Sequence, residues 1–96
     1  MKGAIASVEV FVGRDGEVTR RRLTLTVSAP EPGDNGEWRC RVALADLHRP
    51  ATLSAPDSVT ALGSAMAQGR AWLSELRAQG AVLYRDRAGE TRFEIE

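Results

Sequence analysis

Along the first half of the chain, apolar and polar residues alternate in the way that predicts β-strands with one buried face. Residues 5–12 and 19–28 are two such runs, and the turn-forming pair Asp15-Gly16 between them predicts a β-hairpin. Residues 29–36 contain two prolines and two glycines and are expected to form a loop. A third strand is predicted for residues 37–47, followed by a connection over residues 48–56.

The alternation also predicts which side chains share a face of the sheet. A hairpin tip at Asp15-Gly16 predicts three cross-strand pairs, Val8–Leu23, Glu9–Arg22 and Phe11–Arg20. The apolar face is predicted to carry Val8, Val10, Val12, Leu23, Leu25, Val27, Trp38, Cys40, Val42 and Leu44. The reverse face is predicted to carry Phe11, Arg20, Arg22, Arg39 and Arg41, with Thr24, Thr26, Ala43 and Ala45. Arg21 falls on the apolar face, near its edge.

In the second half the apolar period changes to three and four residues, which predicts an amphipathic helix over residues 57–79. Asp57 suits the helix N-terminus as a cap or in the first turn, and Ser54 is a second candidate cap. Gly80 suits the C-terminal stop. Gly63 and Gly69 lie inside the helix, where glycine is costly, and they indicate a close approach of helix and sheet near Trp38 or Trp72.

Two short strands are predicted after the helix, over residues 82–85 and 91–96, with a turn over residues 86–90. The chain is therefore predicted to be one domain, residues 1–96, of the α+β class. It would have a five-stranded antiparallel sheet in the order β-β-β-α-β-β, with one long amphipathic helix packed on one face. With the strands numbered along the chain, the favoured spatial order is 4-5-1-2-3, and 1-2-3-5-4 is the alternative.

Charge and cysteine content narrow the function classes. Thirteen basic residues balance thirteen acidic ones, which disfavours a nucleic-acid binder, because such proteins usually carry a basic excess. A single cysteine cannot form an internal disulfide, so a reducing, cytoplasmic location is expected. The first apolar run meets Arg14 and Asp15 too early for a signal peptide, and the sequence has no stretch long and apolar enough to span a membrane.

The residue types that carry chemistry are scarce. Cys40 lies between apolar neighbours on the predicted core face, where free cysteine usually packs as a small hydrophobe. His48, at the far end of the same predicted strand, is expected to be a surface residue too distant to pair with Cys40. The carboxylate pairs Asp34/Glu37 and Asp86/Glu90 flank turns. No catalytic residue, metal site, cofactor or small-molecule substrate is inferred, and the chain is not expected to be an enzyme.

Two segments carry a resemblance. Trp38-Arg-Cys40 in a strand, and Asp57-Ser-Val-Thr-Ala-Leu62 at a helix start, resemble an uncharacterised family of small bacterial proteins with the patterns W-x-C and D-S-x-x-A-L. The resemblance covers roughly residues 37–76. It implies this fold and a bacterial, intracellular setting, and no activity. By analogy of size and setting alone, it suggests an immunity-type protein whose partner is a toxin.

The best candidate functional surface is the sheet face that one helix leaves uncovered. Its predicted partner-binding residues are Phe11, Arg20, Arg22, Arg39 and Arg41, because arginine and aromatic residues are enriched at protein interfaces. The sequence therefore favours a non-catalytic module, such as an immunity or adaptor protein, that binds a protein partner. The alternatives are a solvated face without a partner, a structural homodimer through this face or an edge strand, and a nucleic-acid-binding sheet.

Overall fold

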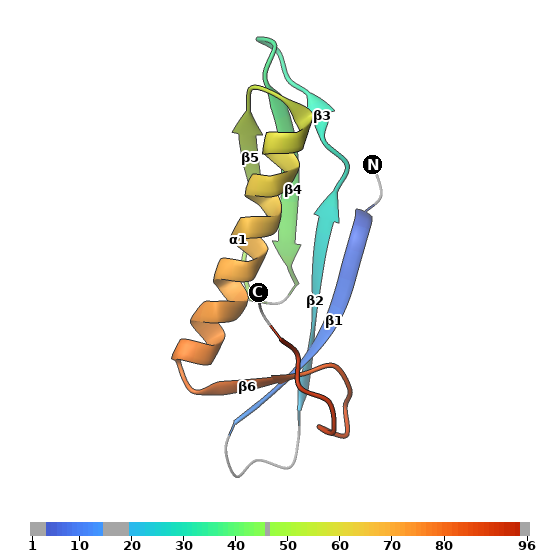
Figure 1. Cartoon of the computed structure of the whole chain (residues 1–96), viewed down its shortest axis with the longest axis vertical. Helices are drawn as coiled ribbons and strands as arrows, with labels where there is room; N and C mark the ends of the chain where they lie inside the picture. The colour runs from blue at the N-terminus through green and yellow to red at the C-terminus, as the bar shows by residue number, and fades with distance from the viewer. Residues whose placement is uncertain (1–3, 15–19, 46, 95–96) are drawn as a thin grey trace.

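The computed structural model describes residues 4–14, 20–45 and 47–94, which form an antiparallel sheet with one helix packed on one face (Figure 1). The strands are β1 (Ala4–Arg14), β2 (Arg21–Ser28), β3 (Glu31–Pro32), β4 (Trp38–Leu44), β5 (Ala51–Ala55) and β6 (Ala81–Tyr84); the helix is α1 (Ser58–Ala78). The predicted α+β class is confirmed. Among the described residues the sheet has six strands, against the five expected.

Strand β4 is the centre of one half of the sheet. Strands β2 and β3 lie end to end along one of its edges, and β5 lies along the other. In the second half, β1 pairs with β2 on one side and with β6 on the other. Both predicted strand orders are therefore wrong. The favoured order placed the last predicted strand beside the first, and the alternative placed it beside the third, whereas the strand directly after the helix lies beside β1.

Strand β5 was predicted to be part of a connection. The chain turns back after Leu44, where the backbone N–H of His48 donates to the Leu44 carbonyl at 3.0 Å. Residues Ala51–Ala55 then pair with β4 from Trp38 to Val42. The predicted third strand is consequently shorter, and the segment expected to link sheet and helix is itself a sheet edge.

The C-terminal segment forms less strand than expected. Strand β6 pairs with residues 11–14 of β1, and the chain then turns over residues 85–90. Of the predicted strand 91–96, Arg92 makes one isolated bridge to Tyr84, and Phe93 donates its N–H to the Leu83 carbonyl at 2.9 Å. Residues 95–96 lie outside the described residues.

The β1–β2 hairpin keeps the predicted faces but not the predicted register. Val8 lies opposite Leu25 instead of Leu23, and Phe11 lies opposite Arg22 instead of Arg20. The shift is two residues, and because side chains alternate with a period of two, each residue keeps its face. The predicted turn pair Asp15-Gly16 lies outside the described residues.

Helix α1 begins and ends near the predicted positions. Asp57 is the N-cap: its carboxylate accepts hydrogen bonds from the Thr60 backbone N–H at 2.7 Å and from the Thr60 hydroxyl at 2.9 Å. Ser54 is not a cap, because it belongs to β5. Gly80 follows the C-cap with a φ of 95°, a conformation that glycine adopts without strain. No helix in the described part of the chain is long and apolar enough to cross a membrane.

The helix lies over β4 and β5 and reaches β2 and β6 (Figure 1). One of the two expected close approaches is present: a Cβ on Gly69 would lie 3.1 Å from both methyl carbons of Leu25. The neighbour is Leu25 and neither of the tryptophans. At Gly63 a Cβ would meet nothing within 4 Å, so close packing does not explain why this position is a glycine.

The core lies between α1 and the face of the sheet that the alternation predicted to be apolar. Its fully buried side chains include Val10, Cys40, Val42, Leu44 and Leu73. We call this face the helix side and the opposite face the open side. The predicted placement of Cys40 between Trp38 and Val42 on the helix side is confirmed. The open side is the sheet face that remains available for binding.

Candidate partner-binding surface

The structure brings three of the five predicted partner-binding residues together. Phe11 and Arg22 are opposite each other on β1 and β2, and the side chain of Arg20 lies against Gly13 on the same face. Arg41 is beside Ser28, whose hydroxyl accepts its backbone N–H at 3.0 Å. Because Ser28 is six residues from Arg22 along β2, Arg41 lies about 20 Å farther along the sheet. Arg39 is farther still from Phe11.

Gly13 allows Arg20 to cross β1. A Cβ at Gly13 would lie 3.3 Å from Cγ of Arg20, so a side chain there would crowd the arginine stem. The Arg20 guanidinium reaches Tyr84 on β6, with its central carbon 4.9 Å from the ring centroid. Its Nη1 donates to the Arg87 carbonyl at 3.2 Å. Arg20 thus joins the first hairpin to the turn that follows β6.

Further arginines from the C-terminal turn complete the surface. The Arg87 guanidinium lies over the Phe11 ring at 5.2 Å, and the Arg92 guanidinium lies over the Tyr84 ring at 5.7 Å. Cation–π contacts of this kind contribute about 0.5–1 kcal/mol each at exposed sites. We call the set the arginine–aromatic cluster; it consists of Phe11, Arg20, Arg22, Tyr84, Arg87 and Arg92.

Half of this cluster was not found from the sequence. Tyr84 was assigned to a strand expected at the edge of the sheet, Arg87 to a turn, and Arg92 to the strand expected beside residues 5–12; none of the three was named as a binding residue. The alternation along residues 81–84 is the signal that would place Tyr84 on the open side. It becomes informative only when β6 is known to pair with β1.

Carboxylates near the cluster are engaged locally. Glu9 forms an ion pair with Arg22 at 3.4 Å, on the predicted face, although the register places Glu9 opposite Thr24. Both side chains are more than half exposed, at 58% for Arg22 and 53% for Glu9, so the pair contributes little to stability. Asp86 accepts the backbone N–H groups of Glu90 and Thr91, each at 3.0 Å. The bond from Thr91, with that from Glu90 and the charge of Arg20, holds the pKa of Asp86 below its ordinary value.

The far end of the open side carries a separate set of charges. Arg39 lies 3.5 Å from Glu37 and 3.8 Å from Asp34, so its charge is compensated by the loop before β4. Arg41 is exposed, two residues farther along the same strand. These two arginines belong to the face that was predicted for binding, but they are not part of the arginine–aromatic cluster.

The thiol and the imidazole are both structural. Cys40 is buried, and its Sγ donates to the Ser28 carbonyl at 3.2 Å. Burial raises the pKa of the Cys40 thiol, which suppresses the reactive thiolate. His48 was expected at the surface; it is half-buried because its ring stacks on Trp72, with centroids 4.7 Å apart and planes inclined by 12°. Within the described ranges, no three or more His, Cys, Asp or Glu residues form a group that could hold a metal ion.

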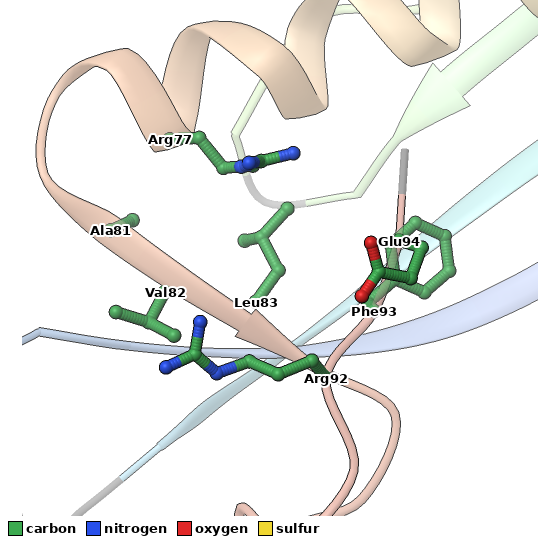
Figure 2. A pocket seen from close by; sticks show the side chains of 7 residues that line it. All are labelled: Arg77, Ala81, Val82, Leu83, Arg92, Phe93 and Glu94. Carbon is green, nitrogen blue, oxygen red and sulfur yellow. The ribbon is translucent and has the colours of Figure 1, made fainter. Parts of the chain in front are cut away.

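Two hollows lie beside the C-terminal end of α1. Figure 2 shows a small one, about 100 Å³, where Arg77, Arg92 and Glu94 surround an apolar floor at the edge of β6. A larger one, about 380 Å³, lies below the end of α1; Arg21 lines it, on the face predicted for that residue. Its remaining lining is mainly apolar, including Val12 and Leu23. Neither hollow presents a nucleophile with a base.

Comparison of the chain with protein-family models, with curated proteins and with solved structures found no match. The resemblance to an uncharacterised bacterial family therefore stays a prediction. Of the residues that carry it, Cys40 and Ala61 are buried, Asp57 caps the helix, and Trp38 and Leu62 pack against the core. Each of these residues has a structural role in this fold.

Proposed function

We propose that this protein is a non-catalytic module that binds a protein partner through the open side of its sheet. The observation that supports the proposal is the arginine–aromatic cluster. Arginine and aromatic residues dominate the binding energy of many protein interfaces. Here two aromatic rings and four arginines come together from β1, β2, β6 and the chain segments beside β2 and β6, and none of the six belongs to the buried core.

Partner capture from the source cells tests this proposal. Arg22→Ala and Arg87→Ala should each abolish co-purification with the partner, because both side chains are exposed and lie in the cluster. Arg41→Ala is the matched control, since it removes the same charge from the same face about 20 Å away. The melting temperatures of all three variants should stay close to that of the original chain. Co-purification that persists in the Arg22 and Arg87 variants would show that the binding surface is elsewhere.

The absence of enzymatic activity and the cytoplasmic location remain part of this proposal. A buried, free Cys40 is compatible with a reducing compartment. A toxin as the partner rests on the analogy of size and setting alone. A toxin-like reading frame beside the gene, and protection of cells that express it, would support that particular role.

A homodimer is the second candidate, and a separate surface favours it. Strand β6 pairs with β1 only from Phe11 onward, so the edge of residues 4–10 has no strand beside it among the described residues. Next to this edge an apolar hollow of about 170 Å³ is lined by Val8, Leu25, Val27 and the half-exposed Met66. Sedimentation at several concentrations should show a reversible dimer that Met66→Glu abolishes and Arg87→Ala does not affect.

A further inference from the structure

We infer that the partner presents an acidic segment, and that Arg87 and Arg92, the exposed arginines that lie over the rings of the cluster, bind its carboxylates. This inference rests on the proposed function and names the chemistry of the partner. It starts from how the arginines are held. Arg20 and Arg92 lie over the ring of Tyr84, and Arg87 lies over the ring of Phe11.

Stacking prepares a guanidinium for carboxylate binding. An arginine carries five N–H donors in a planar fork, and a ring that contacts its flat face leaves those in-plane donors directed outward. Two parallel N–H groups match the two oxygens of a carboxylate, which gives a bidentate, charge-assisted contact. The ring also limits the conformations of the side chain, so less freedom is lost when the carboxylate binds.

The charge of the surface agrees with this partner. The whole chain has no net charge, yet four arginines gather in the cluster. Of the nearby acidic groups, Asp86 is directed into the backbone of its own turn. Glu9 lies on Arg22 at 3.4 Å, in an exposed contact that a competing carboxylate can replace. Glu94 lines the same hollow as Arg92, so the positive charge of the cluster is concentrated around Arg20 and Arg87.

Nucleic acid is a poorer fit to the same surface. Proteins that bind single strands stack bases on exposed aromatic faces. In this cluster, guanidinium groups lie over both rings, so a base would have to displace an arginine before it could stack. A carboxylate requires no such displacement, because it approaches the edge of the guanidinium.

A peptide-binding assay tests the inference with defined probes. Fluorescein-labelled deca-glutamate, deca-glutamine and a ten-nucleotide thymidine oligonucleotide are titrated with the protein at low salt, and anisotropy gives the Kd. We expect deca-glutamate to bind more tightly than either of the other probes. Arg87→Lys keeps the charge and removes the planar fork, and it should raise the Kd for deca-glutamate about tenfold. Arg41→Lys is the control and should leave the Kd unchanged.

Several results would overturn the inference. These are no preference for deca-glutamate over deca-glutamine, an equal effect of the Arg87 and Arg41 variants, an unchanged Kd in Arg87→Lys, or tighter binding of the oligonucleotide. Arg87 is exposed, so its substitution should leave the fold intact; circular dichroism checks this, and Arg92→Lys serves as a second variant. If deca-glutamate fails but partner capture still depends on Arg22, the proposed function stands and only the acidic chemistry is wrong.

Discussion

In the described part of the chain, arginine side chains lie over three of the aromatic rings. In the described chain, Arg20 and Arg92 contact Tyr84, Arg87 contacts Phe11, and Arg85 lies 4.8 Å from the centroid of the Phe93 ring. Each such contact contributes about 0.5–1 kcal/mol, which is small beside the burial of one leucine. Their main effect is to orient exposed side chains.

A second residue with a defined role is Asp57, whose effect should depend on pH. Hydrogen bonds from the Thr60 backbone N–H and hydroxyl hold the pKa of the Asp57 carboxyl below its ordinary value of 3.8. The unfolded chain therefore takes up this proton before the folded chain does. The stabilisation is complete above the ordinary value and is lost as the pH falls through the lower, folded-state pKa.

Asp57→Asn isolates this titration, because asparagine also caps helices but carries no charge. We expect the original chain to be more stable than the variant at neutral pH, where the carboxylate also favours the positive end of the helix. The difference should shrink below pH 3.8 as the carboxyl group becomes neutral. Urea unfolding at a series of pH values measures it, and a difference that is independent of pH would contradict the assignment.

For single residues, the sequence predicted on which face of the sheet a side chain lies, but it did not predict which other side chains it contacts. Phe11, Arg20 and Arg22 were placed on the open side by alternation alone, which needs only the strand period. Their partners Tyr84 and Arg87 could not be found, because a cation–π contact depends on which strand lies next to β1. The stacking of His48 on Trp72 was missed for the same reason: it joins a strand end to the middle of the helix.

At the scale of elements, α1 is defined by its N-terminal cap, its C-terminal glycine and its spacing of apolar residues. All three features could be predicted from the sequence. Its two interior glycines differ in a way that only packing reveals. Gly69 faces Leu25 at contact distance, whereas Gly63 is exposed and faces open space. The same substitution at the two positions should therefore have different results.

Gly63→Ala should stabilise the protein by about 1 kcal/mol, since alanine is the better helix former and the new methyl group meets nothing. In Gly69→Ala the same gain is opposed, because Leu25 must move away from a methyl group at 3.1 Å. Chemical denaturation of the two variants should show a clearly smaller gain, or a loss, at position 69. Equal gains would mean that the helix does not approach β2 as closely as described.

The strands show where local patterns are insufficient. The segment Ala51–Ala55 is short, with Pro50 before it and Pro56 after it, and these signals favour a connection. It becomes a strand because β4 offers it a free edge. The two-residue error in the hairpin register has a similar origin: alternation decides the face of each residue, whereas the length of the turn decides its neighbour.

At the scale of the whole molecule, the sheet is unequally protected. Strand β4 has neighbours on both edges and a helix over it, and its Val42 and Leu44 are fully buried. The first half of β1 pairs with β2 alone, and β6 reaches only residues 11–14. Local opening should therefore begin at the start of β1 and reach β4 last.

Native-state hydrogen exchange should show this gradient directly. The amides of β4 should exchange most slowly, at rates set by global unfolding. In residues 5–10, protected and rapidly exchanging amides should alternate, because every second N–H points away from β2. Residues 11 and 12 provide the internal control, since they are paired with both β2 and β6. Uniform protection over residues 5–10 would show that another strand covers this edge.

The position of β1 between β2 and β6 also has a consequence for how the chain reaches its native state. Phe11 on β1 lies opposite Tyr84 on β6. Strand β1 is synthesised early, and it can pair with β6 only after nearly all of the described chain has been synthesised. Before β6 is present, β1, β2, β4, β5 and the helix can already associate. The Arg20 guanidinium makes its contact with the Tyr84 ring only when β6 joins the sheet. Loops of this length close slowly. The surface assigned to partner binding is consequently assembled last, and an unfinished or truncated chain would not possess it.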